Sequence, residues 1–320
     1  MSGVQTITVE QAEDDTRLDR WFKRRFPDLK HGRLEKLLRT GQIRVDGKRA
    51  KAAQRLEKGQ VVRVPPLGEQ PDLPPDIDRR QTISPADAAM IRACVIHQDD
   101  DVIILNKPPG LAVQGGTGTT KHVDGLLPAL MDDPDADERP KLVHRLDRDT
   151  SGVLVIARTT FAATALTAAF RSRDTRKIYW AVVVGAPVPA EGKIAAPITK
   201  APGKAGERME VDEDWGKPSV TLYRTLDSAF DKAAWLEMEP LTGRTHQLRV
   251  HAAHIGTPIL GDGKYGGAEA HMMGHGISRK LHLHARSLAI PHPRGGTLEV
   301  TADLPEHMRE TFSFFGWAGA

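Results

Sequence analysis

Two carboxylates in the stretch LVHRLDRDTSGVLVIART (142–159) have the surroundings of a reactive site. Asp147 and Asp149 alternate with Arg145 and Arg148, and a strand-like apolar run follows at once. An acid in this setting is a solvated turn residue, a member of a structural ion pair, or a nucleophile that neighbouring cations keep ionised. The rest of the chain must decide between these three interpretations.

The composition is typical of a soluble globular protein that is large enough for two domains. The 320 residues are 39% hydrophobic and 27% charged, and this length supports a substantial core. The lone cysteine, Cys94, excludes a disulfide framework within one chain and fits a reducing compartment. No apolar run approaches the roughly 20 residues of a membrane span, and the polar N-terminus resembles no targeting peptide. We therefore expect a cytoplasmic protein with no membrane partner.

Positive charge is concentrated in residues 17–65. This segment contains 16 Lys and Arg against 5 Asp and Glu, a net charge of +11, so the rest of the chain carries −8 of the overall +3. A compact basic unit on an otherwise acidic protein indicates a polyanionic partner. The alternative is an ordinary solvated surface, which the density of the charge makes less favoured.

The basic segment has the pattern of a small folded unit. Apolar spacing predicts helices in RLDRWFKRRF and HGRLEKLLRTG, and alternation predicts short strands in QIRVDGK and QVVRVPP. This order resembles the alpha-L RNA-binding domain, which we assign to residues 17–65 after an N-terminal tail (1–16). The resemblance implies contacts with RNA phosphates, which position a protein without reading sequence. The cations assigned to these contacts are Arg20, Arg24, Arg33, Lys36, Arg39 and Arg44.

The remaining chain is divided by a proline-rich stretch. Residues 66–90 are predicted to form a semi-rigid linker, although an extended arm packed on the next domain fits as well. From 91 to 320, strand-like runs outnumber helix-like runs and do not strictly alternate with them. This pattern favours an α+β domain with a large, mixed, mostly antiparallel sheet and flanking helices over a doubly wound fold.

Five motifs follow one another in the larger segment. They are DDDVIILNKPPGLAVQGGTG, HRLDRDTSG, KIYWAVVVG, LTGRTHQLRVHAAHIGTPILGDGKYG and LHLHARSLAIPHP. Together they resemble the RluA family of pseudouridine synthases over essentially all of residues 91–320. The resemblance implies an enzyme that detaches uracil from its ribose in RNA, turns it, and rejoins it through C5. Nothing is oxidised or hydrolysed overall, so no cofactor is expected.

The resemblance also assigns the catalytic residues. Asp147, in HRLD, is the nucleophile, and Arg244, in TGRTHQ, is the ionic partner that favours its charged form. Tyr179, in KIYWAVVVG, stacks on the uracil, although without the motif it would also fit the core of a strand. Arg145 matches the arginine that takes the vacated place of the flipped base.

Other motif residues are expected to support this site. His144, Asp149 and Leu248 are assigned structural roles, and Asp149 is expected to bond backbone amides of its own turn. Lys107, in NKPPG, either contacts phosphate or closes a turn, and we group it with the RNA-binding residues.

Three other chemistries fit the sequence less well. HRLDRD resembles a kinase catalytic loop, but its Asp is displaced by one place and the other kinase motifs are absent. Asp147 paired with Asp149 or Asp262 would suit a glycoside hydrolase, but the basic segment favours RNA. The histidines of THQLRVHAAH are interleaved with arginines and form no His-Glu-x-x-His pattern, so no metal is expected.

The sequence leaves the RNA substrate open. Large-subunit (23S) ribosomal RNA, or a precursor particle that contains it, is the expected partner, and transfer RNA is the alternative. A non-catalytic RNA-binding or ribosome-assembly factor is less favoured, because Asp147, Tyr179 and Arg244 are all present. We expect a monomer.

Overall fold

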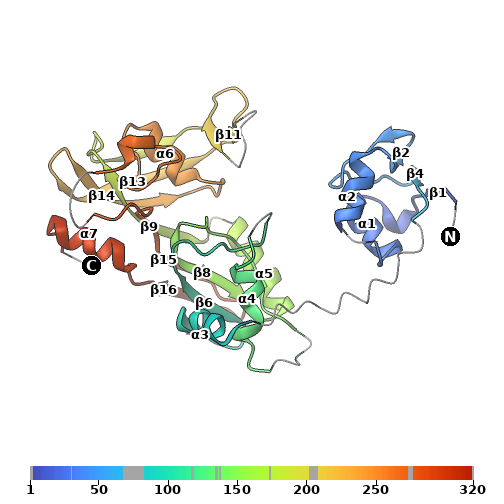
Figure 1. Cartoon of the computed structure of the whole chain (residues 1–320), viewed down its shortest axis with the longest axis horizontal. Coiled ribbons are helices and arrows are strands. Elements are labelled where there is room, and N and C mark those ends of the chain that lie inside the picture. The colour runs from blue at the N-terminus through green and yellow to red at the C-terminus, as the bar shows by residue number, and fades with distance from the viewer. Residues whose placement is uncertain are drawn as a thin grey trace. The chain divides into compact units, whose positions relative to one another are not determined.

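The chain folds into two compact units, residues 1–80 and 81–320 (Figure 1). The structure is a computed structural model, and it describes residues 3–29, 31–67, 83–116, 119–133, 136, 138–172, 174–201, 208–272 and 277–318. Each unit has its own hydrophobic core, so we describe the two separately.

The small unit packs two helices against a four-stranded antiparallel sheet with the strand order β1-β4-β2-β3. The predicted helices and strands are present, but the predicted N-terminal tail (1–16) is wrong, because part of it pairs with β4 as the edge strand β1. The elements are β1 (Gln5–Thr8), a 3-10 turn η1 (Gln11–Glu13), α1 (Leu18–Arg25), α2 (His31–Arg39), β2 (Arg44–Val45), β3 (Lys48–Arg49) and β4 (Val61–Val64).

The apolar spacing of α1 and α2 builds the core of the small unit. Trp21 and Phe22 are 1% exposed and pack with leucines from both helices. The β2–β3 turn places Asp46 and Gly47 at φ 49° and 76°, as a type I′ hairpin requires. Most basic residues of α1 and α2 are exposed, but Arg25 lies over the Trp21 ring and Arg33 is half-buried.

The large unit is built on a ten-stranded sheet. Its main path is β10-β13-β14-β9-β15-β8-β6-β5, with β16 beside β15 and β7 beside β8. Every described pair is antiparallel except β15 with β8, which confirms the predicted mixed, mostly antiparallel sheet. The strands are β5 (Val95–Gln98), β6 (Val102–Lys107), β7 (Lys141–Leu142), β8 (Ser151–Ala157), β9 (Arg176–Val184), β10 (Glu191–Ala195), β13 (Val220–Ala229), β14 (Ala233–Pro240), β15 (Leu283–Pro291) and β16 (Thr297–Thr301), with a separate hairpin of β11 (Ile198–Lys200) and β12 (Met209–Val211).

Helices flank this sheet, and α5 lies beside β8 and β15 (Figure 1). None of the helices among the described residues has the length and apolar character needed to cross a membrane. The helices are α3 (Pro85–Ala93), α4 (Val123–Leu126), α5 (Thr160–Arg171), α6 (Gln247–His254) and α7 (Glu306–Phe315), with 3-10 turns η2 (Leu127–Leu130) and η3 (Gly267–Ala270).

The predicted linker (66–90) extends too far towards the C-terminus, because α3 begins within it. The Ser84 hydroxyl caps this helix by accepting from the amide of Asp87 at 3.1 Å, and Pro85 stands at a favoured first-turn position. Ile91 is fully buried in the core of the large unit. Residues 68–82 of the predicted linker lie outside the described residues.

Strand β8 is buried along its whole length and fixes the loop that precedes it. It pairs with β6 on one side and β15 on the other. Gly152 has φ +105°, and a Cβ there would lie 2.2 Å from the carbonyl oxygen of Ala285. Only glycine allows β15 to approach this closely, so the HRLD loop is anchored at its C-terminal end in the centre of the sheet.

Candidate active site

Asp147 lies in the loop between β7 and β8, where two cavities adjoin. Its side chain is 19% exposed, and it lines both a cavity of about 310 Å³ and a larger one of about 800 Å³. The smaller cavity brings together six of the eight residues of the large unit that the sequence singled out, namely His144, Arg145, Asp147, Tyr179, Arg244 and Leu248.

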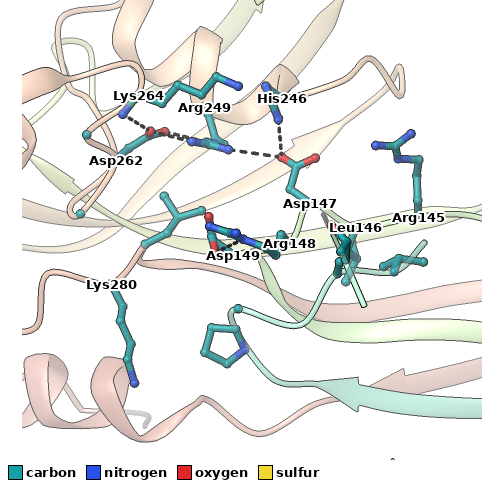
Figure 2. Close-up of a pocket in the computed structure, with 18 of the residues that line it drawn as sticks. Arg145, Leu146, Asp147, Arg148, Asp149, His246, Arg249, Asp262, Lys264 and Lys280 are labelled. Carbon is teal, nitrogen blue, oxygen red and sulfur yellow. Dashed lines mark hydrogen bonds and ion pairs between the residues drawn. The ribbon is translucent and has the colours of Figure 1, made fainter. Parts of the chain in front are cut away.

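The cation nearest to Asp147 is Arg249, and the predicted pairing with Arg244 is wrong. Oδ2 of Asp147 lies 3.8 Å from Nη1 of Arg249 and 3.8 Å from Nε2 of His246 (Figure 2). Arg244 is exposed, and its Nε donates to the carbonyl of Pro218 at 3.4 Å. The difference arises because Arg244 precedes α6, whereas Arg249 lies within this helix and is buried.

Arg249 is held by a buried carboxylate. Its Nε and Nη2 donate to the two oxygens of Asp262 at 2.8 Å each, and Asp262 is 1% exposed. The guanidinium also lies over the Tyr265 ring, 5.0 Å from its centroid. This bidentate pair leaves Nη1 directed at Asp147 (Figure 2). The sequence signal for this pair is Asp262 in LGDGKYG, which the sequence analysis considered only as the second carboxylate of a glycoside hydrolase.

The loop before α6 is locked by Gln247. Its side-chain oxygen accepts from the backbone amide of Arg244 at 3.1 Å and from the hydroxyl of Thr242 at 2.7 Å. Its side-chain nitrogen donates to the carbonyl of Val220 at 2.9 Å and to Thr221 at 3.1 Å. Gln247, which we did not predict, therefore ties the TGRTHQ motif to the start of β13.

Tyr179 lies on β9, between β14 and β15, and is half-buried at the smaller cavity. Burial, and then the negative charge of nearby Asp147, raises the pKa of its phenol above the ordinary value. The phenol is therefore neutral at physiological pH and can offer a proton or its ring face to a base.

His144 and Leu248 support the cavity wall. Nε2 of His144 accepts from the amide of Val155 at 2.8 Å, and its ring stacks on Phe170 with centroids 4.2 Å apart. Burial, and then the charge of Lys177, lowers the pKa of His144 to about 3, so this ring is a neutral acceptor. Leu248 is 6% exposed on α6.

Lys107 does not reach solvent, so its assignment to the RNA-binding set is wrong. It is 1% exposed, and its ammonium donates to the carbonyls of Pro108 (2.9 Å), Leu111 (2.9 Å) and Arg148 (3.0 Å). Burial, opposed by the charges of Asp149 and Asp147, lowers its pKa to about 7. Lys107 instead ties the NKPPG turn to the HRLD loop.

Asp149 is bonded to a side chain and not to the amides that we predicted. Its Oδ1 accepts from Nε of the adjacent Arg148 at 3.1 Å, and both groups face solvent. The turn itself is closed by the amide of Thr150, which donates to the carbonyl of Asp147 at 3.2 Å. Arg145 is exposed at the rim of both cavities.

Two of the six cations assigned to phosphate contacts in the small unit have intramolecular partners. Arg44 donates to the carbonyls of Gly41 (3.1 Å) and Gly47 (3.0 Å), and Arg33 is half-buried and donates to the carbonyl of Leu67. The other four are exposed on α1 and α2, namely Arg20, Arg24, Lys36 and Arg39.

Buried histidines of the large unit bond to other protein groups. His251 bonds Thr221 at 2.8 Å and the carbonyl of Ala196 at 3.0 Å, and His284 bonds Ser151 at 2.9 Å. Among the described residues, no three His, Cys, Asp or Glu side chains are grouped so that they could hold a metal ion.

Comparison with known proteins identifies the family of the chain. Residues 101–254 match the family model for RNA pseudouridylate synthase. The chain is 36% identical to ribosomal large subunit pseudouridine synthase C of Vibrio cholerae, over 97% of this chain and 96% of that protein. It is 33% identical to RNA pseudouridine synthase 4, mitochondrial, of Arabidopsis thaliana, over 96% and 81%.

The fold agrees as well. The solved structure of human RNA pseudouridylate synthase domain containing 4 superposes with a TM-score of 0.61 at 30% identity, over 72% of this chain and 95% of that one. The identity to the Vibrio cholerae protein extends over nearly the full length of both chains. The chain therefore belongs to the RluA family of pseudouridine synthases and is an isomerase that acts on RNA.

Proposed function

We propose that this enzyme converts uridines of large-subunit ribosomal RNA to pseudouridine, with Asp147 as the nucleophile. The observation that carries the proposal is the position of the Asp147 carboxylate, which is mostly buried at a cavity and lies 3.8 Å from the guanidinium of Arg249. The adjacent guanidinium would stabilise negative charge on this carboxylate through electrostatic attraction. Relatives named for the large ribosomal subunit support the choice of RNA.

The chemistry needs one group that acts on carbon while the base is detached. The bond from uracil N1 to ribose C1′ breaks and the bond from C5 to C1′ forms, while C5 loses a proton and N1 gains one. A carboxylate that attacks the sugar or the base divides this exchange into two easier steps. The contacts of Asp147 with His246 and Arg249 both involve Oδ2, so Oδ1 is the oxygen that we assign to the attack.

The other residues of the smaller cavity bind the flipped base. Tyr179 would cover the face of the uracil, since bases removed from their stack are held by aromatic side chains. Exposed Arg145 would occupy the vacated position in the RNA. Arg244, which is also exposed at this cavity, would contact the RNA and not the catalytic carboxylate.

The small unit would hold the surrounding RNA. Arg20, Arg24, Lys36 and Arg39 are exposed on the two helices, whose other faces form the core. This arrangement, and the resemblance to the alpha-L domain, support contacts with the phosphate backbone.

Complementation followed by pseudouridine mapping tests the proposal. Cells that lack the gene would receive the wild type, Asp147→Asn, or Asp149→Asn as a matched control from the same loop. We expect specific large-subunit sites to regain pseudouridine with the wild type and the control but not with Asp147→Asn. Restoration by Asp147→Asn would refute the nucleophilic role. If cells that lack the gene lose pseudouridine from transfer RNA alone, the assignment of large-subunit ribosomal RNA as the substrate is refuted.

A further inference from the structure

We propose that His246 is a positioning residue for the catalytic carboxylate, and that Tyr265 holds it in the tautomer that donates from Nε2 to Asp147. This assignment rests on the proposed nucleophilic role of Asp147. His246 was not among the residues that the motifs assigned to catalysis. Its side chain is 11% exposed and lines both cavities.

Two donors converge on one oxygen of the catalytic carboxylate. Nε2 of His246 and Nη1 of Arg249 each lie 3.8 Å from Oδ2 of Asp147, and Figure 2 shows both side chains turned towards this oxygen. The distances exceed those of ordinary hydrogen bonds. Catalytic hydrogen bonds are often long in the unliganded enzyme and shorten when substrate binds. A small movement of the loop would therefore complete both bonds.

The contact between His246 and Tyr265 determines the tautomer. The Tyr265 hydroxyl lies 2.6 Å from Nδ1 of His246, and its oxygen accepts from the amide of Met209 at 3.1 Å. The phenol oxygen already accepts from the amide, so we assign its own proton to the bond with Nδ1. A neutral imidazole that accepts at Nδ1 carries its own proton on Nε2, which is the nitrogen that faces Asp147.

One loop orients both donors. Within 261–265, Asp262 holds Arg249 through two 2.8 Å bonds, and Tyr265 holds His246 through its hydroxyl. The backbone of His246 is left-handed, with φ 55°. Few residues other than glycine adopt this conformation, and His and Asn are among the more tolerant. This tolerance provides a test that separates the backbone requirement from the donor requirement.

His246→Asn and His246→Gln give opposite expectations. Asn suits the left-handed backbone and can still accept from Tyr265, but its amide is too short to reach Asp147. Gln suits the backbone less well, but its amide nitrogen can take the place of Nε2. If donation to Asp147 matters, the single-turnover rate falls by about tenfold or more in His246→Asn, as expected when a bond to a charged group is removed, and stays much closer to wild type in His246→Gln.

A faster single-turnover rate in His246→Asn than in His246→Gln would overturn the proposal, because it would mean that only the backbone conformation matters. The control is His254→Gln, at an exposed position on the same helix, which should leave the rate unchanged. RNA affinity should not change in any variant. A fall in affinity with an unchanged rate would also overturn the proposal, since His246 would then contact RNA.

Tyr265→Phe tests whether the hydroxyl acts through His246. It keeps the ring beneath Arg249 and removes the proton that fixes the tautomer, so the rate should fall several-fold. In a His246→Ala background the same change should have little further effect on the rate. Independent, additive reductions would overturn the coupling. Activity in Asp147→Asn, by contrast, would reject the proposed nucleophile itself, so the two failures are distinguishable.

Discussion

The pairing of Asp147 with Arg249 predicts which arginine of the TGRTHQLR motif controls the rate. Replacement of Arg249 by Gln removes the positive charge 3.8 Å from the carboxylate, whereas Arg244→Ala removes an exposed side chain that contacts the carbonyl of Pro218. We expect the first change to reduce the single-turnover rate strongly. The second should act mainly on RNA affinity.

The magnitude follows from the 3.8 Å separation. Two unit charges at this distance attract by about 4 kcal/mol at an effective dielectric constant of about 20, and by about 1 kcal/mol in bulk water. Asp147 is 19% exposed and Arg249 is 9% exposed, so the site lies between these limits and nearer the first. The expected reduction in rate therefore lies between about sixfold and about a thousandfold.

Stability must be separated from catalysis, because Arg249→Gln alone leaves the buried charge of Asp262 without its partner. Such a change costs about 3–5 kcal/mol of folding free energy. The double variant Arg249→Gln/Asp262→Asn restores a neutral, hydrogen-bonded pair, and it should recover much of the stability in urea unfolding. Its rate should remain low, because the cation beside Asp147 is still missing.

The assay is the release of tritium from RNA labelled at uridine C5, measured with enzyme in excess, since formation of the new C5 bond expels this hydrogen. Circular dichroism confirms the folded state of each variant at the assay temperature. A double variant that is folded and as fast as wild type would refute the electrostatic role of Arg249. So would an Arg244→Ala variant whose chemical step is abolished while RNA binding persists.

Three further predictions follow from the same structural features. Burial lowers the pKa of Lys107 to about 7, whereas an unfolded lysine titrates near ~10.4, so between these pH values the unfolded state binds more protons. The unfolding free energy of wild type, compared with that of Lys107→Met, should therefore rise from pH 7 to pH 10. An identical pH dependence of the two proteins would contradict the burial of the ammonium. Arg145→Ala should slow the reaction more on folded RNA than on a short unstructured oligonucleotide, because only folded RNA has a stack to refill; equal reductions would argue against base flipping. Replacement of Arg20, Arg24, Lys36 and Arg39 by Gln should reduce the slope of log affinity against log salt, measured in binding titrations. The reduction should be about 0.7–0.9 for each phosphate that the variant no longer binds. An unchanged slope would show that the helices of the small unit do not hold RNA.

The fold could be predicted where local pattern determines structure. The spacing of Trp21 and Phe22, the all-apolar run of β8 and the helical pattern of α6 all formed the expected elements. The predicted domain boundaries were wrong where the local composition suggested a tail or a linker but the chain forms a strand or a helix. Strand β1 exists because β4 pairs with it across more than fifty residues. Helix α3 begins in a proline-rich stretch because Ser84 caps it and Pro85 suits its first turn.

The contacts that the Asp147 carboxylate makes could be predicted from the sequence only in part. The choice between Arg244 and Arg249 depends on where α6 begins, and also on Asp262, which is thirteen residues beyond Arg249. The role of Lys107 depends on the carbonyl of Arg148, forty-one residues away. A motif identifies which cations belong near an acid, but only tertiary contacts show which of these cations the protein holds beside that acid.

Buried and exposed cations around the candidate active site are suited to different roles. A buried cation needs internal partners because desolvation is costly, and here Arg249 has Asp262 while Lys107 has three carbonyls. These cations can set the electrostatics and shape of the site, but the RNA backbone cannot reach them. We therefore assign contacts with phosphate to exposed cations such as Arg244, whereas exposed Arg145 is assigned to the vacated position of the flipped base. Substitutions of the buried cations should consequently change the rate of the chemical step or the stability, and those of the cations assigned to phosphate should change RNA affinity and its dependence on salt.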